Sequence, residues 1–296
     1  MSLIKKIYLV LTHPGILFRY KSFKIRKIYY FLSKFLHLKT FYSRKSKIDT
    51  KSHLYLRGFE KIEVDTLKKH NLDIDTIILT IKDKVTNVVY TKDQDGIKSI
   101  QIQNLFDTNS KVFNFLTSDY LIDKVSAYLG CVPLLAYSSI WYSENKEKFI
   151  NSSQEFHLDH EDLKQIKGFL YLDDIDENNG AMNLFPLKSS SKVIEEINYN
   201  TSQEKKRVKD DAFVKYENEK IVCKGKKGTL YLVDTSQCFH CGARKSSKSR
   251  LLLMFQFITP WANHLKWNWK NSEFIKNNNW EIKNLNKIQR KVLGIN

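Results

Sequence analysis

A histidine and an aspartate two positions apart, His157 and Asp159, have the types and spacing that best suit metal chemistry in this chain. In an extended strand, residues i and i+2 point to the same side, so an imidazole nitrogen and a carboxylate oxygen can approach one point. A strand turns too slowly to supply a third ligand from the same stretch. His240, which follows an apolar run at 229–233 and a turn-like stretch, is the best candidate for that ligand.

Two histidines and one carboxylate on one face of an octahedron leave three positions open, which is typical of non-haem iron(II) oxygenases. Two of these positions accept a chelating 2-oxo acid and the third accepts O2. Arg250 follows His240 by ten positions (250 − 240 = 10) and opens another apolar run. Its guanidinium is suited to bind the distal carboxylate of 2-oxoglutarate through two hydrogen bonds.

Apolar periodicity predicts the elements that must position these residues. Residues 110–130 carry apolar side chains at three-and-four spacing, which predicts a helix with Ser118 as a plausible N-cap and Gly130 at its end. After Pro133, short β-rich runs separated by turns predict an all-β sandwich or barrel. The runs are 134–142, 168–172, 181–185, 229–233 and 251–258.

Two further segments have weaker patterns. Residues 193–220 show no core pattern, so we expect a long loop with a helical piece. The tail 261–296 holds four of the five tryptophans and is expected to pack as helix on the sheet.

Three stretches resemble the phytanoyl-CoA dioxygenase family. They are 154–186, which contains FHLDHEDLKQIKGFLYLDDIDENNGAMNLFP, then 228–257, GTLYLVDTSQCFHCGARKSSKSRLLLMFQF, and 129–143, LGCVPLLAYSSIWYS. The resemblance implies an α+β chain with a mainly β core: a double-stranded β-helix, or jelly-roll and cupin-like barrel, with flanking helices. It also implies Fe(II) held by His157, Asp159 and His240, with Arg250 as the anchor of the co-substrate 2-oxoglutarate and O2 as the oxidant.

Lys167 lies on the strand after the His-x-Asp stretch. It is expected either to assist 2-oxoglutarate by its charge or to be a solvated lysine at the strand edge. The chain also departs from the family, because Leu187-Lys188-Ser189 follows Pro186 where many members have Gly-Ser-His. We therefore expect that loop to contact substrate differently. The carboxylate of Asp159 argues against a halogenase, which needs a small residue at that position.

The residues around these motifs also allow other interpretations. Cys238 and Cys241 flank His240 as a C-x-x-C, but a structural zinc needs a second ligand pair at matching spacing, and none is present. Packing roles are therefore expected for both thiols. The acidic stretch 173–180 is interpreted as a polar turn with Gly180 at positive φ, in preference to a calcium site. Tyr137 and Trp141 share one face of a strand, and the pattern does not say whether that face lines a pocket or packs in the core.

The positive charge is concentrated at the start of the chain. The net charge is +17, and residues 1–48 hold twelve Lys or Arg and no acid. We expect a basic helical segment, 1–48, followed by a single oxygenase domain, 49–296. The segment suits a helix packed on its own domain or an interfacial helix on anionic lipid, and it suits a nucleic-acid patch less well.

The compartment is expected to be the cytoplasm, with peripheral contact to a membrane as an option. No apolar run approaches the roughly 20 residues of a spanning helix, and no secretory signal is evident. Four cysteines in a chain of 296 residues do not make a disulfide framework.

The functional prediction is an Fe(II)- and 2-oxoglutarate-dependent dioxygenase that hydroxylates an aliphatic C–H of a small-molecule, lipid-linked or glycan substrate. Two alternatives stay open: a non-catalytic binding protein that keeps the barrel, and a zinc metallohydrolase that uses the same His/Asp cluster. The sequence does not identify the substrate, although the basic start favours one located at a membrane.

Overall fold

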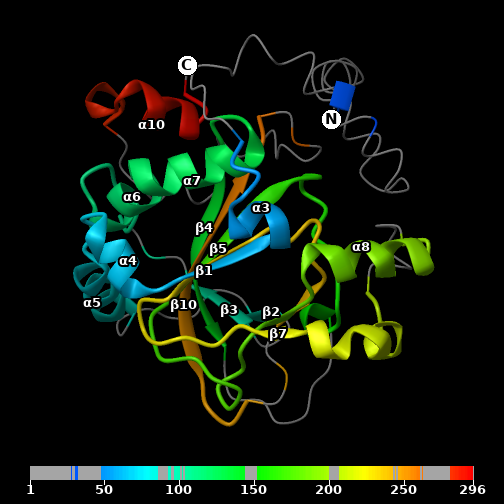
Figure 1. Cartoon of the computed structure of the whole chain (residues 1–296). Coiled ribbons are helices and arrows are strands. Elements are labelled where there is room, and N and C mark those ends of the chain that lie inside the picture. Colours follow the sequence, from blue (N-terminus) through cyan, green and yellow to red (C-terminus); the bar gives the residue numbers. More distant parts are fainter. Residues whose placement is uncertain are drawn as a thin grey trace, which may run out of the picture.

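The computed structural model describes residues 28, 31–32, 48–85, 93–94, 97–100, 102, 104–143, 152–199, 207–242, 244, 246–260, 262 and 281–295. Its strands form two antiparallel sheets, ordered β1-β8-β5-β10-β4-β3-β2 and β7-β6-β9 (Figure 1). The strands are β1 (Phe59–Ile62), β2 (Asp93–Gln94), β3 (Ile97–Ile100), β4 (Leu134–Ser143), β5 (Gln165–Tyr171), β6 (Asn183–Leu184), β7 (Ile221–Val222), β8 (Leu230–Val233), β9 (His240–Cys241) and β10 (Arg250–Ile258).

The two sheets enclose one apolar cluster between them. Phe169 of β5 and Met254 of β10 contribute to it from the larger sheet, and Leu184 of β6 contributes from the smaller one. Because successive side chains alternate between faces, Ile166 and Leu170 of β5 point to the opposite side, into a second cluster beneath the helices. The chain is therefore a double-stranded β-helix with flanking helices, as expected.

Helices cover both outer faces of this barrel (Figure 1). The outer face of the larger sheet shares its core with α4 (Val64–Lys69), α5 (Ile74–Val85), α6 (Lys111–Leu116), α7 (Asp119–Leu129) and α10 (Lys287–Val292). On the far side, α8 (Leu187–Glu196) and the 3-10 helix η4 (Asp210–Glu219) pack against the smaller sheet. The remaining helices are α3 (His53–Arg57) and the 3-10 turns η2 (Ser152–Gln154) and η6 (Ile282–Asn284).

The helical structure predicted over 110–130 is confirmed, and the structure divides it into two helices, α6 and α7. Ser118 has an extended backbone, with φ −61° and ψ 145°, and its side chain accepts a hydrogen bond from the backbone N–H of Leu121. It is thus the N-cap of α7, and an N-cap residue interrupts the preceding helix, which ends at Leu116. The predicted end at Gly130 is confirmed, since Gly130 has φ 76° and caps α7.

The prediction that residues 193–220 have no core pattern is wrong. Val193, Tyr199, Val208 and Phe213 are buried and pack with Phe239 in the cluster outside the smaller sheet. Their spacing follows neither a regular helix nor a strand, because the segment passes through α8, a bridge to Phe156 and a 3-10 helix. The predicted helical piece is present as α8 and η4.

Several predictions concern residues outside the described part. These include most of the basic segment 1–48 and the four tail tryptophans, Trp261, Trp267, Trp269 and Trp280. The described end of the tail forms α10, whose Val292 and the following Leu293 are buried in the core, as expected for a helix packed on the sheet. In the part of the chain that can be inspected, no helix has the length and apolar character needed to cross a bilayer.

Candidate metal centre

The two predicted histidines lie opposite each other across a pair of short extended segments. His157 N–H donates to His240 O at 3.0 Å, and His240 N–H donates to His157 O at 3.2 Å. Such a reciprocal pair holds two directly opposed residues of an antiparallel ladder, so both side chains leave the same face. Their ring centroids are 4.3 Å apart. The backbone pairing therefore brings together two imidazoles that are 83 positions apart in sequence (240 − 157 = 83).

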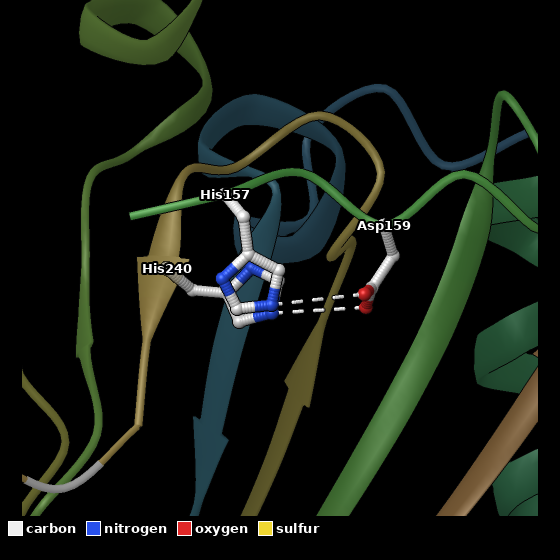
Figure 2. Close-up of side chains that lie close together, drawn as sticks. All are labelled: His157, Asp159 and His240. Carbon is white, nitrogen blue, oxygen red and sulfur yellow. Dashed lines mark ion pairs between the residues drawn. The ribbon is translucent and has the colours of Figure 1, made fainter. Parts of the chain in front are cut away.

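Asp159 reaches the same point by strand alternation. Its backbone N–H donates to Thr235 O at 2.8 Å, which fixes the segment after His157 beside the turn that follows β8. The Thr235 hydroxyl in turn accepts from the Gln165 amide at 2.9 Å. The carboxylate then faces both rings, with Oδ1 at 3.9 Å from His157 Nε2 and Oδ2 at 3.7 Å from His240 Nε2 (Figure 2).

The three side chains are close enough together to hold a metal ion. One donor atom from each of His157, Asp159 and His240 lies within 4.8 Å of the other two, and within the described residues this is the group that could hold a metal ion. All three residues are buried. The predicted convergence of the two histidines and the aspartate is thus observed in the structure.

Each imidazole has a defined orientation and tautomer. His157 Nδ1 lies 2.9 Å from Glu155 O, and His240 Nδ1 lies 3.1 Å from Cys238 O. A carbonyl oxygen only accepts, so we assign the proton of each neutral ring to Nδ1. The lone pair of each Nε2 then points toward Asp159. A backbone carbonyl on the far nitrogen is the usual support of a metal-binding histidine.

The charges around the centre favour neutral imidazoles and an ionised carboxylate. Burial lowers the pKa of His157 well below its usual value and also lowers the pKa of His240, so both rings are neutral near pH 7. Burial alone would raise the pKa of Asp159, but Lys167 and the two histidines outweigh it and the pKa is lowered. Neutral imidazole and carboxylate are the protonation states that bind a divalent metal. The donor set therefore fits such an ion.

Lys167 belongs to this centre. Its ammonium lies 2.7 Å from Asp159 Oδ2, and only 13% of its side chain is exposed, so the alternative of a solvated edge lysine is wrong. Burial opposes its charge, but Asp159 and Glu161 more than compensate and raise the pKa of Lys167. Glu161 is a second, half-buried carboxylate that interacts with the charge of Lys167, and its pKa is lowered chiefly by Lys167 against the effect of burial. No role is predicted for Glu161 from the sequence.

Arg250 lies at the opposite end of the barrel interior from Lys167. Lys167 pairs with Gln256 near the end of β10, whereas Arg250 opens that strand. The guanidinium is buried and donates to Gly180 O at 2.5 Å and to Ser143 Oγ at 3.3 Å. Within the described residues no carboxylate pairs with it, and burial lowers its pKa. None of the hydrogen bonds of Arg250 described here is made to His157, Asp159 or His240.

A second arginine near the centre was missed by sequence reasoning. Arg207 precedes Val208, which forms a bridge with Phe156, the residue before His157. The positive charge of Arg207 contributes to the lowered pKa values of both His157 and His240. The available signal was the alternation of basic and apolar residues at 207–209. The prediction of a loop without a core pattern over the surrounding 28 residues (193–220) does not include this signal.

The remaining predictions around the centre have clear outcomes. Cys238 packs in the cluster between the sheets and Cys241 in the cluster outside the smaller sheet, so the two thiols lie on opposite faces and pack as expected. Gly180 has φ 75°, which confirms the polar turn. Tyr137 and Trp141 are partly buried and pack against the cluster between the sheets, so their face of β4 points into the barrel.

Comparison with known proteins gives fold-level similarity only. No family model matches the chain, and no curated protein matches it. The resemblance to phytanoyl-CoA dioxygenases therefore remains a resemblance carried by the quoted motifs.

Several solved structures are similar over part of the chain. The epimerase SnoN in complex with Fe3+, alpha ketoglutarate and nogalamycin RO has a TM-score of 0.48 at 12% identity, covering 70% of this chain and 80% of its own. HygX from Streptomyces hygroscopicus with nickel, 2-oxoglutarate and hygromycin B has a TM-score of 0.48 at 15% identity, covering 70% of this chain and 85% of its own. EctD from S. alaskensis in its apoform has a TM-score of 0.47 at 16% identity, covering 72% of this chain and 80% of its own. Identity at this level does not specify chemistry, because one fold hosts many reactions.

Proposed function

We propose that the chain is an Fe(II)- and 2-oxoglutarate-dependent oxygenase. The observation that carries the proposal is the convergence of two neutral Nε2 donors and one ionised carboxylate from His157, His240 and Asp159. Three protein ligands of this kind leave open positions for a chelating co-substrate and O2. When bound, the iron and 2-oxoglutarate supply the oxidising chemistry: decarboxylation to succinate and CO2, coupled to hydroxylation of a substrate carbon.

The residues of the chain bind and orient in this proposal. Lys167 keeps Asp159 ionised, so the carboxylate presents charge to the metal. Arg250 is a buried guanidinium with no carboxylate beside it among the described residues, which suits it to the distal carboxylate of 2-oxoglutarate. Leu252 and Met254 of β10 belong to the apolar cluster between the two sheets, so they would exclude water from the methylene groups of a co-substrate bound there.

The test is succinate formation from 2-oxoglutarate with added Fe(II) and O2. We expect His157→Ala to abolish it, because one of three metal ligands is lost, and Arg250→Gln to raise the KM for 2-oxoglutarate by about tenfold or more. Equal turnover in wild type and His157→Ala would overturn the assignment. Hydrolytic activity with zinc in the absence of O2 would favour the metallohydrolase, and a protein that holds no metal would favour the non-catalytic binding protein.

We further propose peripheral contact with an anionic membrane through the basic segment 1–48. Its described helical residues Ile28, Phe31 and Leu32 are exposed, and their spacing of three and four places them on one helical face. An exposed apolar face among twelve positive charges suits the interface of an anionic bilayer. Salt-sensitive sedimentation with anionic but not neutral vesicles tests this proposal. Salt-sensitive binding of DNA or RNA without vesicle binding would favour a nucleic-acid partner.

A further inference from the structure

The bridge between the two histidines is too short to hold them by itself. His157 and His240 form an isolated bridge with two backbone hydrogen bonds, and β9, which carries His240, has two residues. Even a complete two-stranded hairpin is only marginally stable in water. The spacing of the two imidazoles therefore depends on contacts outside the bridge.

One aromatic ring packs behind both histidines. Phe156 and Phe239 precede them in sequence and belong to the cluster outside the smaller sheet, on the opposite face from the imidazoles (Figure 2). The ring centroid of Phe213, in η4, lies 4.5 Å from that of Phe156 and 5.1 Å from that of Phe239. Phe213 thus contacts both ligand-bearing segments from outside the barrel.

The ring of Phe213 is itself fixed in place. It is 1% exposed and stacks on Phe185, with centroids 4.5 Å apart and ring planes 11° apart. The Phe185 N–H donates to Phe239 O at 2.8 Å, which joins the end of β6 to the residue before His240. Because interiors of this kind are closely packed, a smaller side chain at 213 would let both segments shift.

A hydroxyl of α8 fixes the backbone before His240. Ser190 is fully buried, and its Oγ accepts from the Phe239 N–H at 2.9 Å and donates to Phe185 O at 2.9 Å. Removing this hydroxyl would take an acceptor from a buried N–H, which is costly because the group is shielded from water. The Phe239 backbone, from which His240 follows, is therefore held by α8.

We propose that Phe213 and Ser190 are positioning residues of the metal centre. The Phe213 ring sets the spacing of the two imidazoles from outside the barrel, and the Ser190 hydroxyl fixes the segment that presents His240. This inference rests on the proposed function only through the metal, because it requires the two histidines and Asp159 to bind a divalent ion. Groups that support the ligands without touching the metal commonly change its affinity about 10- to 100-fold.

The first test is titration of the full metal-free chain with Co(II), followed by the visible absorption of the bound ion. We expect Phe213→Leu to bind Co(II) about tenfold more weakly than the wild type, with shifted bands because the ligand geometry changes. Phe113→Leu is the matched control, since Phe113 is also 1% exposed and packs in the cluster beneath the helices. It should keep the affinity and the bands, although it too loses core packing.

The second test changes a single oxygen atom and leaves the aromatic rings in place. Ser190→Ala should also weaken Co(II) binding about tenfold and shift the bands. Ser189→Ala is its matched control, because Ser189 is equally buried and its hydroxyl donates to Pro186 O at 3.1 Å, away from Phe239. This pair decides the proposal if Phe213→Leu does not fold.

Urea unfolding of the metal-free variants separates positioning from a general loss of stability. The proposal is overturned if a folded Phe213→Leu or Ser190→Ala binds Co(II) like its control. It is also overturned if affinity falls in all four variants in proportion to stability. An affinity loss with unchanged bands would overturn it as well, since the ligands would then keep their arrangement.

The outcomes distinguish this inference from the proposed function. A wild type that binds no Co(II), or a His157→Ala variant that binds it equally well, would overturn the metal centre and the positioning roles together. Variants that match their controls, in a chain with His157-dependent Co(II) binding, would overturn the positioning roles alone. The expected Co(II) results in a chain that forms no succinate would contradict the oxygenase assignment and still support the positioning roles.

Discussion

Asp159 and Asp162 lie three positions apart, both are buried, and their pKa values shift in opposite directions. Lys167 and the two histidines lower the pKa of Asp159 against the effect of burial. Burial raises the pKa of Asp162 to about 7. The hydrogen bonds that Asp162 accepts come from uncharged donors: the Thr259 N–H and hydroxyl at 2.8 and 2.6 Å, and the Leu163 N–H at 2.7 Å.

The difference shows how the surroundings of a buried carboxylate decide whether it is ionised. Neutral donors reduce the cost of burying a charge, but in the barrel they do not remove it. The nearby cation Lys167 does remove this cost for Asp159, which is also the carboxylate that faces the two imidazoles. Asp162 instead ties the segment after the centre to Thr259 at the end of β10.

The matched pair Asp159→Asn and Asp162→Asn would test this contrast most strongly. Asp159→Asn removes the charged ligand, so we expect iron(II) affinity to fall by more than about 100-fold, beyond the cost of losing an outer-shell partner. Asp162→Asn keeps an acceptor for Thr259 and should leave the affinity close to wild type. Anaerobic metal titration measures both. Similar losses in the two variants would mean that Asp159 acts through the fold and is not a ligand.

The pH dependence of stability gives the next largest effect. An unfolded aspartate has a pKa near 3.9, and the folded pKa of Asp162 is about 7, so between these values the folded state holds more protons. The contribution of Asp162 is therefore complete below about pH 4 and is lost as pH rises toward 7. We expect the free energy of unfolding to fall by about 2 kcal/mol between pH 5 and pH 7 from this group.

Urea unfolding of the metal-free protein at several pH values measures this slope. The difference between wild type and Asp162→Asn isolates it, because the amide does not titrate. A difference that stays constant with pH, or that changes in the opposite direction, would show that Asp162 is ionised throughout and that its three donors outweigh burial.

The sequence predicted the parts of the fold that have strong local signals. The apolar runs at 134–142 and 251–258 became β4 and β10 with bounds differing by one residue, because long buried strands keep their pattern along the whole run. The strands β1, β7 and β9 have four residues or fewer and are not predicted, whereas β8, which is as short, is predicted because all four of its residues are apolar. His240 was nevertheless found, because its chemistry and not its strand identified it.

Arg207 and Lys167 show where sequence reasoning ends. The charge of buried Lys167 is compensated by Asp159 and Glu161, eight and six positions earlier (167 − 159 = 8, 167 − 161 = 6), and neither a helix period nor a strand period predicts a contact at that spacing. Arg207 lies beside the segment that carries His157 because the next residue, Val208, forms a bridge with Phe156, 52 positions earlier (208 − 156 = 52). Pairing between residues so far apart is determined by the packing of the whole barrel and not by local propensity.

The smallest expected effect concerns the two faces of β5, where adjacent residues point to the metal centre and to the apolar core. Lys167 points to the metal position, whereas a Cβ added at Gly168 would lie 2.0 Å from Cζ of Phe255 on the helix-covered face. That ring is buried and packs edge-on against Phe115 and Phe257, so it cannot move aside freely. We expect Gly168→Ala to lower the free energy of unfolding by about 1–2 kcal/mol.

Gly242→Ala is the control, since its Cβ would have no contact closer than 3.4 Å. Iron(II) affinity should be unchanged in Gly168→Ala, because Lys167 and Asp159 keep their positions. A loss of metal binding would mean that the two faces of β5 are coupled and that core packing positions the residues of the centre.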